Sequence, residues 1–205
     1  MNERNELKEG LRRLSTGLGL MMAATALPLM IHYSPMPFLD MRVTGWITII
    51  LDCIALGFFI PGLLRLTAAP EALEIRGVAL LVLGGVVLEP LARVMEQLLF
   101  MVRLFEMDLS IIWLVAGLAE SAGYVGMAYM LWRIELDGAP ATEPFKAPPL
   151  FLAAAGAAAA CGLLRVVRML NILPIFGIIS LAYLALFVML FIIVRNQRTR
   201  LDTAV

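Results

Sequence analysis

The chain has 205 residues, of which 61% are hydrophobic and only 16% are charged, with 16 basic residues balancing 16 acidic ones. Soluble domains are about 45–50% apolar and about 25% charged, whereas the mean hydropathy here is +0.91. These values exclude a soluble globular domain, a disordered chain and a basic nucleic-acid-binding protein. The sequence therefore predicts a polytopic protein of the lipid bilayer.

The first 13 residues are rich in charge, and Leu7, Leu11 and Leu14 recur at spacings of four and three. This pattern predicts a short amphipathic helix that lies at the cytoplasmic membrane surface and runs into the first membrane helix, or an ordinary extension of that helix. The apolar run that follows contains an Ala-x-Ala sequence at 24–26, which resembles a signal-peptide cleavage site. Because the run continues beyond it, we interpret 14–33 as a retained transmembrane helix.

A helix needs about 20 mostly apolar residues to cross a hydrocarbon core of about 30 Å. Six segments meet this requirement. We therefore predict an all-α bundle of six transmembrane helices forming a single domain over 1–205, with the spans within 14–195 and a tail at 196–205. Asn171 and Pro174 mark the boundary between the last two spans, since proline readily opens a helix. The predicted spans are 14–33, 46–66, 77–102, 109–132, 149–170 and 172–195.

The distribution of lysine and arginine predicts the orientation of the bundle. Four basic residues lie in the N-terminal segment and three in the tail, and the second and fourth connections hold two each. With six spans these four regions fall on the same side, whereas Arg42 and Arg103 fall opposite. We therefore expect a protein of a bacterial-type inner (plasma) membrane with both termini on the cytoplasmic side.

Ionisable residues occur inside four of the predicted spans. Glu89, Arg93 and Glu96 share one face of the third span because they are spaced by four and three residues. A charge at the bilayer centre costs at least about 2.5–3.5 kcal/mol on insertion scales, so these groups are expected to converge in the outer half of the bundle. The network then contains four acidic and three basic residues, so we expect either that Arg103 also belongs to it or that one carboxylate is protonated. The predicted network comprises Asp52, Glu89, Arg93, Glu96, Glu120, Arg165 and Arg168, with Tyr124 beside Glu120.

Small residues recur every fourth position on three spans, which predicts close packing between helices of one chain or of two copies. On the first span they are Ser15, Gly19 and Ala23. The corresponding residues of the fourth and fifth spans are Gly117, Ser121, Ala154, Ala158 and Gly162.

Motifs for catalysis, phosphate binding and metal binding are missing from the sequence. The chain has a single histidine, His32, and its two cysteines, Cys53 and Cys161, are far apart. We therefore assign no catalytic residue, no metal ligand and no cofactor, and we favour a protein that is not an enzyme.

Two interpretations of the charge network stay open, namely a polar cavity for a ligand, ion or proton and a closed set of ion pairs that fixes helix register. The first interpretation predicts a small transporter, channel or ligand-binding membrane module. The absence of catalytic motifs, the short loops and the small-residue stripes fit an alternative class, a non-catalytic accessory subunit or assembly factor of a larger membrane complex, with a homo-oligomer or other membrane subunits as partners. A third class is a lipid-acting membrane enzyme, whose arginines would hold a phosphate head group.

Overall fold

The computed structural model describes residues 2–33, 41–67, 73–101, 110–136, 149–169 and 176–203, which are helical apart from a turn at Thr67. Each predicted span lies almost whole within one helix. The last two are separate helices, whereas the residues proposed to mark their boundary lie outside the described part of the chain. The helices are α1 (Asn2–Tyr33), α2 (Met41–Leu66), α3 (Leu73–Met101), α4 (Ser110–Leu136), α5 (Pro149–Met169) and α6 (Phe176–Thr203).

The N-terminal charged segment is part of one continuous helix, because α1 runs from Asn2 to Tyr33. Leu11, Leu14 and Leu18 are fully buried along this helix. The leucine repeat therefore extends the core-facing side of the first span, and its place at the membrane surface stays a prediction.

Five helices, α1, α2, α4, α5 and α6, are long and apolar enough to cross a membrane. The comparable apolar stretch found among the described residues of α3 is shorter, Gly77–Ala92. The structure thus supports an all-helical, multi-pass membrane protein, and the sixth span stays a prediction.

Large apolar side chains cover the outside of the bundle as well as its core. A soluble monomer rarely exposes extended apolar patches, whereas a lipid-facing surface consists of such side chains. Each of the six helices contributes at least one of them. Examples in chain order are Met30, Ile50, Leu80, Ile111, Leu163 and Ile178, all more than half exposed.

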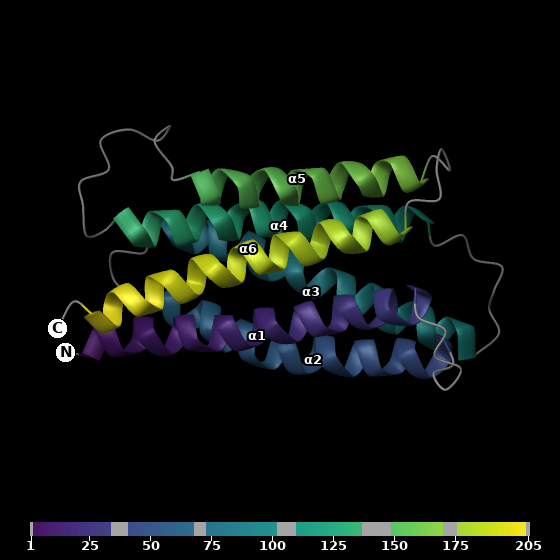
Figure 1. Cartoon of the computed structure of the whole chain (residues 1–205), viewed down its shortest axis with the longest axis horizontal. Helices are drawn as coiled ribbons and strands as arrows, with labels where there is room; N and C mark the ends of the chain where they lie inside the picture. The colour runs from purple at the N-terminus through teal and green to yellow at the C-terminus, as the bar shows by residue number, and fades with distance from the viewer. Residues whose placement is uncertain are drawn as a thin grey trace.

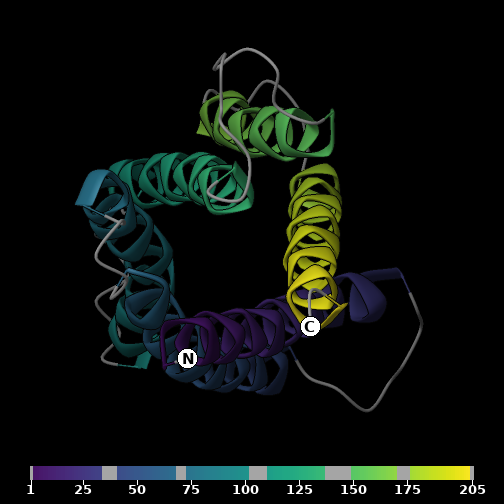
Figure 2. The ribbon, with the colours of Figure 1, turned by 90° about the vertical axis from the view of Figure 1, so that its left-hand side faces the viewer.

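The helices run along one long axis and form a ring, as Figures 1 and 2 show. Helix α1 packs against α2 and α6, while α4 packs against α3 and α5 and makes a smaller contact with α6. The first turns of α1 and the last turns of α6 lie at the same end (Figure 1). Lys8 Nζ of α1 lies 2.9 Å from Asp202 Oδ1 of α6 there, so an ion pair joins the two ends of the chain.

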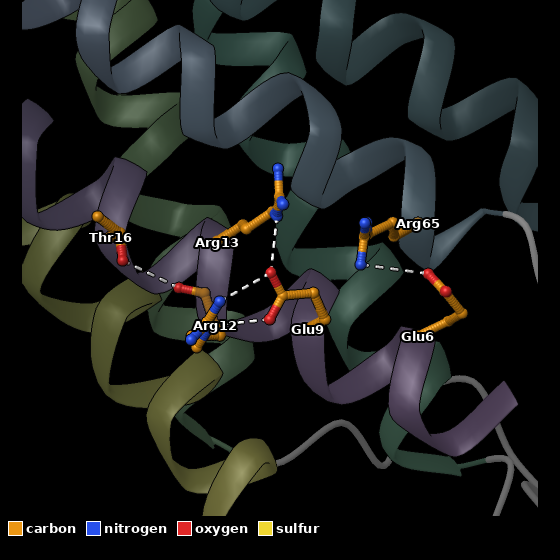
Figure 3. A network of polar contacts seen from close by, with 6 residues as sticks. All are labelled: Glu6, Glu9, Arg12, Arg13, Thr16 and Arg65. Atoms are coloured by element: carbon orange, nitrogen blue, oxygen red, sulfur yellow. Dashed lines mark hydrogen bonds and ion pairs between the residues drawn. The ribbon is translucent and has the colours of Figure 1, made fainter. Parts of the chain in front are cut away.

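A network of charged side chains lies on α1 at this same end (Figure 3). Glu9 contacts Arg12 at 2.8 Å and Arg13 at 2.9 Å within the helix. Arg65 of α2 lies 3.4 Å from Glu6 of α1. Exposed ion pairs of this kind contribute only about 0–1 kcal/mol each, so they add little to the stability of the bundle.

Glycine allows α3 and α4 to approach each other at the backbone. A Cβ atom on Gly85 would collide with the carbonyl oxygen of Ala119, and one on Gly123 would lie 3.3 Å from Gly85 Cα. Backbone atoms cannot rotate away as a flexible side chain can. The separation of α3 and α4 therefore depends on the missing side chain at Gly85.

The small-residue stripes of α4 and α5 pack against each other within the chain, whereas for the stripe of α1 only packing between two copies stays a prediction. A Cβ on Gly162 of α5 would lie 3.2 Å from Ser121 Cβ of α4, so these two stripes face each other. On α1 a Cβ at Gly19 would meet no atom within 4 Å. The close contact with α2 instead uses Gly17, where a Cβ would lie 3.1 Å from the Ala55 carbonyl.

We predict that Gly85→Ala lowers the free energy of unfolding by about 1–3 kcal/mol, because the added methyl group forces α3 and α4 apart. Gly84→Ala is the matched control, since a Cβ on this neighbouring residue meets nothing within 4 Å. Thermal unfolding of both variants in detergent checks the prediction. Equal stability of the two variants would contradict the close approach of the helices.

Candidate functional site

Glu120 of α4 and Arg165 of α5 form an ion pair in the interior of the bundle. The Nη2 atom of Arg165 lies 3.7 Å from Oε2 of Glu120, and the two side chains are only 10% and 7% exposed. Two charges removed from water attract each other strongly because the surrounding dielectric constant is low. The structure therefore brings two of the predicted site residues together as a buried pair of opposite charges.

Gly117 creates the space through which Arg165 reaches Glu120. A Cβ on Gly117 would lie 3.0 Å from Cδ and 3.1 Å from Nε of Arg165. The arginine side chain thus lies across the bare backbone of α4, one turn before Glu120. Long arginine side chains can cover apolar surface in this way while their charged end reaches a polar group.

Helix α6 contributes an aromatic wall to the same site. The guanidinium carbon of Arg165 lies 5.3 Å from the centre of the Tyr183 ring, within the range of a cation–π interaction. The Tyr183 hydroxyl lies 3.4 Å from Ser121 Oγ, which donates a hydrogen bond to the Gly117 carbonyl at 2.9 Å. Three helices therefore position the guanidinium.

Tyr124 lies one turn further along α4 and links the site to α1. Its hydroxyl donates to the sulfur of Met21 at 3.5 Å, and its ring meets Phe187 edge-on with 5.2 Å between ring centres. Tyr124 is almost completely buried. The polar site is therefore bounded on this side by a packed aromatic and sulfur cluster.

One oxygen of the Glu120 carboxylate receives no hydrogen bond. Among the described residues none donates to Oε2, and its 3.7 Å separation from Arg165 exceeds the usual N–H···O length of about 2.7–3.2 Å. A buried acceptor without a donor costs about 1–3 kcal/mol, and more if it is charged. This oxygen is therefore the atom of the site best placed to receive a proton, a water molecule or a ligand donor.

The remaining predicted site residues have different positions. Asp52 is buried on α2, which packs against α1 and α3, and Arg168 is exposed on α5. Glu89, Arg93 and Glu96 belong to α3, but their side chains lie outside the described part of the structure, as does Arg103. A single network of all these residues stays a prediction.

Sequence reasoning missed Tyr183 and Gln197. Tyr183 is buried four residues before Phe187, with which its ring also packs. Gln197 is buried near the end of α6 and donates a hydrogen bond to the Leu131 carbonyl of α4. A search for charged residues overlooks both, whereas a search for any polar group on the core-facing side of an apolar helix would have found them.

The described residues contain no group of three or more histidine, cysteine, aspartate or glutamate side chains that could hold a metal ion. Comparison of the chain with family models, with curated proteins and with solved structures finds no match. The assignment of a function therefore depends on the geometry of the site.

We predict that Arg165→Met destabilises the protein by about 3–5 kcal/mol, because it leaves a buried carboxylate without its counter-ion. The double variant Glu120→Leu/Arg165→Met should regain most of this loss, since neither charge then remains. Chemical unfolding in detergent measures both values. Arg198→Met, which removes an exposed arginine of α6, is the control and should change stability by less than about 0.5 kcal/mol. Additive losses in the double variant would contradict an interaction between the two residues.

Proposed function

We propose that the chain is a small membrane transporter in which Glu120 exchanges a proton and Arg165 is its counter-ion. The observation that carries this proposal is the buried Glu120–Arg165 pair with one carboxylate oxygen that no described residue bonds. Ionisable residues inside membrane helices commonly form ion pathways and proton relays. A purely structural pair would favour a full set of hydrogen bonds around both groups.

In this proposal α3 is the sixth span, and both termini lie in the cytoplasm. Its length of 29 residues corresponds to about 44 Å of helix, which is sufficient for the bilayer. Leu80, Leu88 and Leu98 are 69%, 43% and 50% exposed along it, as expected of a helix in contact with lipid. The charged side of α3 is then expected to face the bundle.

The depth of Glu120 supports a role in transport. It lies ten residues after the start of α4 at Ser110, a distance of about 15 Å along the helix, near the middle of a hydrocarbon core of about 30 Å. A proton bound there is separated from both surfaces. Protonation of Glu120 weakens its attraction to Arg165, which gives the site two states that differ in charge and geometry.

Proton flux into liposomes tests the proposal. Purified protein is reconstituted with a pH-sensitive dye inside the vesicles, and a potassium gradient with valinomycin drives protons inward. We expect wild-type protein to acidify the interior at least tenfold faster than empty vesicles do, and Glu120→Gln to abolish this increase. Arg12→Gln, which removes an exposed charge from α1 outside the predicted network, should retain the wild-type rate.

Two results would contradict the proposal. Wild-type vesicles that acidify no faster than empty ones would favour the accessory-subunit alternative. Equal flux through wild-type and Glu120→Gln protein would show that protons bypass the pair. Gel filtration of each variant before reconstitution confirms that a loss of flux does not arise from misfolding.

A further inference from the structure

The outward face of α6 combines an apolar stripe with arginines at one end. Ile178, Leu181, Val188 and Ile192 are 55%, 54%, 40% and 41% exposed. Together with the exposed Ala185 they recur at spacings of three and four residues, so they form one continuous side of the helix. The next residue of the stripe is the exposed Arg195, and Arg198 follows one turn later.

The length of this stripe matches the hydrocarbon layer of a membrane. From Ile178 to Arg195 the helix rises by about 26 Å, compared with a hydrocarbon core of about 30 Å. The arginines therefore lie at the level where the phosphates of one leaflet begin. In the predicted orientation this is the cytoplasmic leaflet, to which anionic lipids attract basic residues.

Nearby carboxylates are already engaged by other cations. Glu6 contacts Arg65, Glu9 contacts Arg12 and Arg13, and Asp202 contacts Lys8. The Lys8–Asp202 pair also sets the antiparallel register of α1 and α6, which places Arg12 at the level of Arg198.

Within the described part of the chain, no ion pair is formed by the side chains of Arg195 and Arg198. Two exposed guanidinium groups one turn apart are thus left to bind an anion from outside the chain.

We propose that α6, beside its contact with α1, binds an anionic phospholipid. The phosphate is held by Arg195 and Arg198, and an acyl chain lies along the apolar stripe. Planar guanidinium groups suit phosphate because each can donate two parallel hydrogen bonds. The site is at the end of the bundle where the chain termini meet, away from the Glu120–Arg165 pair, and it does not depend on the proposed transport.

Native mass spectrometry of the delipidated full-length protein tests this site. Phosphatidylglycerol and phosphatidylcholine with the same acyl chains are titrated separately into wild-type protein and two double variants. We expect wild-type protein to bind phosphatidylglycerol at least tenfold more tightly than phosphatidylcholine. Arg195→Gln/Arg198→Gln should lose about fivefold in affinity for each arginine removed.

Arg65→Gln/Arg133→Gln is the matched control, because it removes the same charge from other helices at the same end. It should keep the wild-type preference for phosphatidylglycerol. An equal loss in both double variants would overturn the proposal in favour of general attraction to a basic surface, and no loss in either would overturn it outright.

The contribution of the acyl chain is tested with glycerol phosphate, which has the anionic group alone. Glycerol phosphate should compete only weakly with phosphatidylglycerol, and Val188→Ser/Ile192→Ser should weaken lipid binding while both arginines are present. If glycerol phosphate displaced phosphatidylglycerol when the two were present at equal concentration, the lipid assignment would be overturned. The site would then be one for free phosphate compounds. Gel filtration in detergent confirms the fold of each variant.

Discussion

A carboxylate and a guanidinium that share the interior of an apolar bundle place strict demands on the helices around them. Neither Glu120 nor Arg165 could be buried alone without a large loss of hydration energy, so α4 and α5 must remain in one register. Gly117 has to leave room for the arginine, and Tyr183 has to present the face of its ring. The ion pair thus determines side-chain size on one helix, charge on the next and aromatic character on a third.

The site also depends on contacts that contain no polar atom. Helix α4 is held against α3 at Gly85 and Gly123, and the Gly85 contact involves Ala119, the residue directly before Glu120. Displacement of α3 would therefore move the carboxylate itself. Packing of small residues can position a charged group in a membrane because dispersion forces, rather than the hydrophobic effect, hold lipid-embedded helices together.

The helical content, the approximate ends of the six helices and the burial of Glu120 were predictable from the sequence, because hydropathy and the energy of burying charge act locally. The partner of Glu120 was only one of several arginines that the pattern allowed, since pairing depends on the relative depth and rotation of two helices. Tyr183 was missed because an aromatic residue in an apolar helix carries no distinctive pattern. Gly19 was assigned to a packing face, but α1 packs through Gly17 instead. A stripe of small residues indicates which faces can approach closely, whereas the neighbouring helices decide which of them do.

The Lys8–Asp202 pair brings together residues separated by almost the whole chain. Helices α2 to α6 can each associate with the helix made just before, but the contact of α1 with α6 can form only after the last helix has been synthesised. Closure of the ring is therefore a single late event in assembly. The Lys8–Asp202 contact closes a loop that contains almost the whole chain. In the finished bundle α1 and α6 are adjacent helices that no direct connection joins, so their association depends on side-chain contacts such as the Lys8–Asp202 pair.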